Sequence, residues 1–206
     1  MARRKSDQRK VCNDFYIITN GAQTEKNYFD LLKAKHSVYS VHVKFENADP
    51  LDLVEYAKAF LNNANQIWCV FDIDYTHDDG RLVPALNLAE QYGIKIAYSN
   101  KAFEVWLISH FETFSTKMPI GNYSGVLTAR LNDIGYSDVY DKTDKSLLQK
   151  YFIPNYKAAI DNAKIVYQHY VKQHNKECGP NSKMPIWKWD ASTTVFKLVE
   201  ALKLRS

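Results

Sequence analysis

Two aspartates one residue apart, Asp72 and Asp74, are the side chains in this sequence that point most directly to chemistry. They follow an unbroken apolar run, Ile67–Phe71, which is typical of a strand buried on both faces. Residues two apart in an extended segment point to the same side, so the two carboxylates would face one point. Such a pair is costly unless a cation compensates it, and Mg²⁺ prefers carboxylates, water and phosphate oxygens. The pair predicts a metal site for phosphoryl transfer, with a solvated acidic loop as the alternative.

A polar segment, Asn20–Glu25, follows an earlier apolar stretch, Phe15–Thr19. Gly21 permits a tight turn from a strand into a helix, and Thr24 is placed to cap a helix that begins with Glu25. A helix N-terminus of this kind can receive a phosphate group. We therefore expect the segment to contact a substrate phosphate, although a purely structural turn explains the same residues equally well.

The elements that must position these residues alternate over the first 100 positions. Strand-like stretches are expected at Phe15–Thr19, Val41–Phe45, Ile67–Ile73 and Ile94–Tyr98, and helices at Glu25–Lys35, Leu51–Asn62 and Val83–Tyr92. This order predicts a mostly parallel sheet with helical crossovers. Ligands bind at the carboxyl edge of such a sheet, where the last strand leads into Asn100 and, one helical turn later, Glu104.

The strand signal fades after residue 100. Helices are expected at Ala102–Glu112, Tyr123–Ile134, Asn155–Asn175 and Ser192–Leu204, and a loop at Glu177–Lys188. We therefore divide the chain into a basic tail at residues 1–12, an α/β core at 13–112 and a helical C-terminal part at 113–206 that packs on the core.

Composition limits the class of protein. A length of 206 residues with 46% hydrophobic and 24% charged residues is ordinary for a globular chain and argues against disorder. No apolar run reaches the ~20 residues that a membrane span needs, and three cysteines without a CxxC pair favour a cytoplasmic protein. The net charge of +4 lies in residues 1–10, which carry five basic residues and one acidic residue. Such a tail either contacts nucleic acid or is simply solvated.

Other motifs add little. The sequence lacks GxGxxG, GxxxxGK[ST], HExxH and GxSxG patterns, which disfavours nucleotide-loop, zinc-protease and acyl-transfer chemistry. His77 could help to position a metal-bound water; the alternative is a surface histidine without a functional role. Trp187 and Trp189 flank Lys188 and form an aromatic and basic cluster that suggests a partner or nucleic-acid surface.

Three segments resemble, in order and spacing, the motifs of RloB-like proteins. Ile17–Phe29 is similar to their EGxxTExxYF opening, Val70–Asp74 to their VFDxD strand, and Ser99–Phe111 to their SNPxFExWLLxHF segment. A helical end near Ala191–Thr194 is also similar, so the resemblance extends over most of the chain.

This resemblance implies a small Toprim-like α/β fold, of the type found in topoisomerases, primases and OLD-type nucleases. It also implies a nuclease effector of a prokaryotic antiphage, abortive-infection locus, dependent on Mg²⁺ (or Mn²⁺) and working with an ABC-type ATPase. Asp72 and Asp74 match the metal-binding pair, and Glu104 matches a carboxylate of the third motif. Asn100, its motif neighbour, is expected to bind substrate together with Asn20, Gly21 and Thr24. DNA or RNA as the substrate, and a homo-oligomeric state, both remain open.

One position departs from the Toprim pattern. Asn20 stands where those proteins carry an acid, and an amide cannot transfer a proton near neutral pH. In one interpretation Glu25, five residues on, takes over this role and Glu104 assists. In the other, the chain is a weakened or inactive module that binds a partner or nucleic acid and regulates a defence complex.

Overall fold

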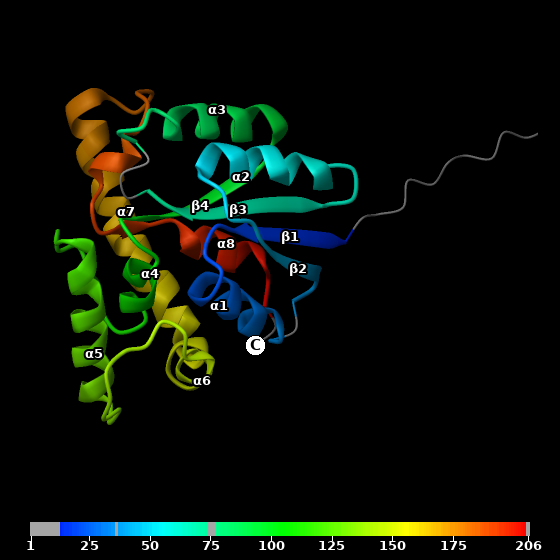
Figure 1. Cartoon of the computed structure of the whole chain (residues 1–206). Helices are drawn as coiled ribbons and strands as arrows, with labels where there is room; N and C mark the ends of the chain where they lie inside the picture. Colours follow the sequence, from blue (N-terminus) through cyan, green and yellow to red (C-terminus); the bar gives the residue numbers. More distant parts are fainter. Residues whose placement is uncertain (1–12, 36, 74–76, 205–206) are drawn as a thin grey trace, which may run out of the picture.

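The structure, a computed structural model, describes residues 13–35, 37–73 and 77–204. Its centre is a five-stranded sheet in the order β2-β1-β3-β4-β5 (Figure 1). The strands are β1 (Asp14–Thr19), β2 (Ser40–Phe45), β3 (Gln66–Asp72), β4 (Lys95–Asn100) and β5 (Ser192–Thr193). The first four are parallel and β5 is antiparallel, which confirms the predicted α/β class with a mostly parallel sheet. The predicted basic tail at residues 1–12 lies outside the described residues.

Helices cover both faces of the sheet. One face carries α2 (Pro50–Ala57) and α3 (Leu82–Tyr92), and the other carries α1 (Thr24–Lys33), α4 (Glu104–Ile108) and α8 (Val195–Ala201) (Figure 1). Successive strand residues alternate between the two layers, because Ile17 packs in the core on the α1 side and Ile18 in the core on the α2 side. The central strand β3 is therefore buried on both sides, as the unbroken apolar run Ile67–Phe71 predicts, whereas the edge strand β2 has no buried residue.

The C-terminal half adds α5 (Tyr123–Asp133), α6 (Lys145–Leu147), a π-helical turn at Leu148–Phe152 and the 23-residue helix α7 (Tyr156–Cys178). Short 3₁₀ turns lie at Lys58–Phe60, Ile120–Asn122, Ile153–Asn155 and Ile186–Lys188. The short helix α4 packs against both α5 and α7, so the helical part is joined to the end of the sheet through α4 (Figure 1).

One predicted helix begins with a strand instead. Ser192 and Thr193 form β5 beside β4, and α8 starts only at Val195. The side chain of Thr193 donates to the carbonyl of Tyr98 at 2.9 Å, so this hydroxyl completes the sheet edge. The helix predicted at residues 102–112 is also shorter, because α4 ends at Ile108.

Within the part of the chain that the structure describes, none of the helices combines the length and the apolarity that crossing a bilayer requires.

Candidate active site at the carboxyl edge of the sheet

The carboxyl ends of the central strands meet at one edge, as predicted. β1 lies between β2 and β3, and Thr19 at its end pairs with Val70 of β3. The backbone N–H of Asn20 extends this pairing by donating to the Val70 carbonyl at 3.2 Å. Asp72 follows two residues later and pairs with Ser99 of β4. The segments that leave these three strands therefore start side by side.

A pocket of about 620 Å³ lies at this edge, and we call it the carboxylate pocket. It is lined by the turn after β1 and the start of α1 (Gly21, Ala22, Gln23, Thr24, Glu25), by Asp72, by the entry to α4 (Ala102, Phe103, Glu104), and by Ile120 and Lys142. Glu25, Asp72 and Glu104 are thus brought to one cavity from three different strand ends. Glu25, the candidate replacement for the acid that is missing at Asn20, reaches the same cavity as the other two.

Gly21 makes room for the carboxylate of Glu25. A Cβ atom at this position would lie 1.9 Å from Oε2 of Glu25, closer than any real contact. The residue has no left-handed backbone angle, so close approach, and not the turn itself, is what requires glycine here.

Burial has the largest effect on the pKa values of the two glutamates in this pocket. Burial raises the pKa of Glu25, and the negative charge of Glu104 raises it further, while the ammonium of Lys142 lowers it. Burial likewise raises the pKa of Glu104, again opposed by Lys142. A cation in the pocket would relieve the energetic cost of keeping both groups ionised.

Thr24 does not cap α1, contrary to the prediction. The N-cap residue is Gln23, which makes no side-chain cap bond, and the Thr24 hydroxyl instead donates to the carbonyl of Lys142 at 2.9 Å. This bond fixes the loop that brings Lys142 to the pocket. Sequence reasoning missed Lys142, because nothing in its local sequence relates it to a segment 118 residues earlier.

The two predicted amide residues lie apart from this cavity. Asn100 is 1% exposed, and its side-chain nitrogen donates to the carbonyls of Ile186 and Trp187 at 3.0 and 3.1 Å. It therefore anchors the loop that precedes β5. Asn20 is half-buried beside β3 and is not part of the pocket lining.

The residues present fit a divalent cation in their chemistry. Three carboxylates share the cavity, and oxygen ligands of this kind suit Mg²⁺ or Mn²⁺. Within residues 13–35, 37–73 and 77–204, no three His, Cys, Asp or Glu side chains are already arranged as a ligand set. Asp74, the second acid of the predicted pair, lies outside the described residues.

The predicted aromatic and basic cluster is divided between core and surface. Trp189 is 4% exposed and belongs to the core, whereas Lys188 is exposed. The ring of Trp187 stacks on His77, with centroids 4.1 Å apart and planes within 14°. Trp187 and His77 thereby join the loop after β3 to the loop before β5.

The family model for RloB-like protein matches residues 15–202, nearly the whole chain. The chain belongs to the RloB-like family. No curated protein and no solved structure matches it. In this RloB-like chain the three motif segments lead into one edge of the sheet, and each contributes one carboxylate to the same cavity.

Proposed function

We propose that this RloB-like protein is a metal-dependent nuclease of the Toprim type. The observation that carries the proposal is the convergence of Glu25, Asp72 and Glu104 in one pocket together with Lys142. Carboxylates beside a lysine at the carboxyl edge of a parallel sheet suit phosphodiester hydrolysis, because the acids hold a cation and the lysine neutralises a phosphate oxygen.

Each residue has a distinct role in this proposal. Asp72 and Glu104, with Asp74, would hold Mg²⁺, which stabilises charge on the attacking and leaving oxygens when it is bound. Glu25 has a raised pKa, which suits a carboxylate that takes a proton from the attacking water near neutral pH. Lys142 orients the phosphate through its ammonium group.

The biological setting is inferred from the family. The resemblance of this chain to RloB-like proteins of antiphage, abortive-infection loci supports a defence role in which an ABC-type ATPase controls the nuclease. In that setting the ATPase would restrain or release cleavage of DNA or RNA, tRNA included.

The test is cleavage of a panel of single-stranded and double-stranded DNA, RNA and tRNA with and without Mg²⁺, and with and without the ATPase. Asp72→Ala should lower the rate at least about 100-fold, since it removes a metal ligand. Asp161→Ala, at an exposed position on α7, is the matched control and should cleave normally. Full cleavage by Asp72→Ala would refute the metal assignment.

A second candidate function is favoured by Asn20. If the amide disables chemistry, the chain is a binding module that regulates a defence complex. Asn20→Glu separates the two candidates: a gain of cleavage over an inactive parent supports the regulator, and cleavage by the unaltered protein excludes it.

A further inference from the structure

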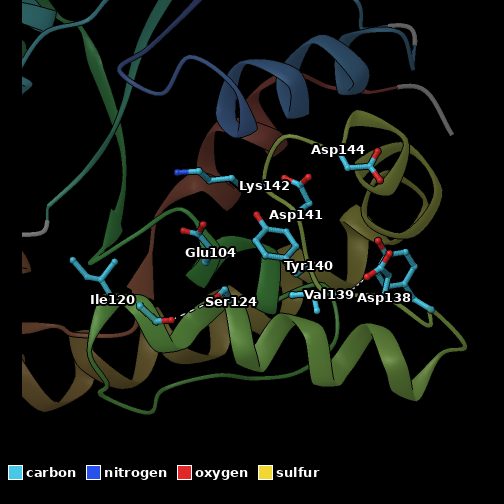
Figure 2. A pocket seen from close by; sticks show the side chains of 11 residues that line it. Glu104, Ile120, Ser124, Asp138, Val139, Tyr140, Asp141, Lys142 and Asp144 are labelled. Atoms are coloured by element: carbon cyan, nitrogen blue, oxygen red, sulfur yellow. Dashed lines mark hydrogen bonds between the residues drawn. The ribbon is translucent and has the colours of Figure 1, made fainter.

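A second cavity of about 670 Å³ adjoins the carboxylate pocket, and we call it the side pocket. It lies between the start of α5 and the loop at residues 136–144, and Figure 2 shows it from close by. Glu104, Ile120 and Lys142 line both cavities, so a ligand can extend from one into the other. Its volume is within the range of about 300–1,000 Å³ that is usual for small-molecule sites.

Tyr140 carries the hydroxyl in this cavity that is best placed to donate a hydrogen bond to a ligand. Its side chain is 7% exposed, and its buried hydroxyl makes no hydrogen bond of ordinary geometry, although the side chain of Thr24 lies near enough to lower its pKa somewhat. Figure 2 shows the hydroxyl directed toward the space between Glu104 and Lys142. Burial and the charge of Glu104 raise the pKa of Tyr140, so the hydroxyl keeps its proton and remains a donor. A buried hydroxyl that makes no hydrogen bond of ordinary geometry costs free energy that a bound acceptor would recover.

The rim of the side pocket is rich in acceptors. Asp141 accepts from the backbone N–H and the hydroxyl of Thr143, both at 2.8 Å, and Asp144 accepts from the backbone and the hydroxyl of Ser146. These bonds lower the pKa of both carboxyls and keep them ionised. An ionised rim repels a phosphate and attracts a group that carries N–H donors.

Apolar and aromatic side chains complete the cavity. Ile120 and Val139 are 36% and 66% exposed and offer apolar surface to a ligand in this cavity. Tyr136 is half-buried and packs edge-on against Tyr151, with centroids 5.7 Å apart. A flat aromatic ligand would find apolar contacts here beside hydrogen-bond acceptors.

We propose that the side pocket binds a nucleobase that carries an exocyclic amino group, on the nucleotide next to the cleaved phosphate. The inference rests on the proposed nuclease function and names its substrate more closely. The phosphate lies at Lys142, the amino group donates to the carboxylate rim, and a ring nitrogen or carbonyl accepts from Tyr140. Such a base must leave its stack, so the substrate is single-stranded or has the nucleotide extruded.

The experiment measures binding without cleavage. Labelled single-stranded oligomers of adenine, cytosine or uracil nucleotides, and an abasic oligomer, are titrated in EDTA and followed by fluorescence anisotropy. Adenine and cytosine oligomers should bind about 10-fold more tightly than uracil and abasic ones, because uracil presents a carbonyl where the others carry an amino group. Tyr140→Phe and Asp141→Asn should reduce this preference to less than about 3-fold, while Asp161→Asn keeps it.

Equal binding of all four oligomers, or a preference that Tyr140→Phe and Asp141→Asn leave unchanged, would overturn the side-pocket assignment. Circular dichroism of each variant shows whether it folds, and Asp141 is exposed, so its change does not disturb the core. The two proposals fail separately. A base preference without any Mg²⁺-dependent cleavage would support base binding in the side pocket and refute the nuclease function. Cleavage without a base preference would support the nuclease function and refute base binding in the side pocket.

Discussion

The carboxylate of Glu25 occupies the space that a side chain at position 21 would need. The absence of one carbon atom at Gly21 therefore decides where an acid of the proposed active site lies. In this position the Glu25 carboxylate is affected by the charges of Glu104 and Lys142.

Gly21→Ala tests this dependence. The added Cβ would displace the Glu25 carboxylate, which is the flexible end of its side chain, so the backbone can stay in place. We expect cleavage to fall about 10- to 100-fold because a catalytic group is misplaced. The melting temperature should change by less than about 3 °C.

Gly125→Ala is the matched control, since a Cβ there meets no atom within 4 Å and the residue lies inside α5. It should leave cleavage unchanged and stabilise the helix by up to about 1 kcal/mol. Normal cleavage by Gly21→Ala would mean that the position of Glu25 does not matter.

Sequence reasoning could place the acids and could not place their partners. Glu25, Asp72 and Glu104 each follow a recognisable strand, and the order of strands predicts one shared edge. Lys142 and Tyr140 come from a loop in the helical half whose position depends on tertiary packing, so no local pattern relates them to the acids.

At the level of elements, the last strand and the loop before it hold the edge of the sheet together. The short strand β5 pairs with the end of β4, and the side chain of Asn100 binds two carbonyls of the preceding loop. Periodicity predicts the four longer strands well. It fails for β5, because a strand of two residues is too short to show an alternation of apolar and polar side chains. In addition, Ser192-Thr193-Thr194 has the composition of a helix cap.

Asn100→Ala shows whether this amide is a structural anchor or a substrate ligand. Removing it leaves the carbonyls of Ile186 and Trp187 without their donor, which should cost about 2–3 kcal/mol in urea unfolding. The exposed Asn132→Ala should cost less than about 0.5 kcal/mol. Unchanged stability with weakened nucleic-acid binding would instead support the predicted substrate contact.

At the scale of the whole molecule, the proposed active site lowers the stability of the fold that carries it. Two half-buried acids with raised pKa values, Glu25 and Glu104, line one pocket. The unfolded chain loses protons from these groups at a lower pH than the folded chain does. The free energy of unfolding therefore falls as pH rises from the ordinary glutamate value of 4.5 through the raised pKa.

Glu104→Gln removes this dependence at one of the two acids. We expect the variant to unfold at higher urea than the parent at pH 8, with the difference vanishing near pH 4, where both states of the parent are protonated. Mg²⁺ should stabilise the parent more than the variant, since a cation favours the ionised acids. Exposed Glu90→Gln serves as control and should show the same difference from the parent at every pH. If the free energy of unfolding of Glu104→Gln had the same pH dependence as that of the parent, the raised pKa of Glu104 would not be what lowers stability.

The place of β5 in the chain has a consequence for biosynthesis. Among the described residues, the outer edge of β4 near Tyr98–Asn100 pairs with residues 191–194, so it stays open on the ribosome until nearly all of the described chain has emerged. An uncovered strand edge is a template for pairing with other chains. We therefore expect a fragment that stops before residue 191 to aggregate, because the edge of β4 is then left without its pairing partner.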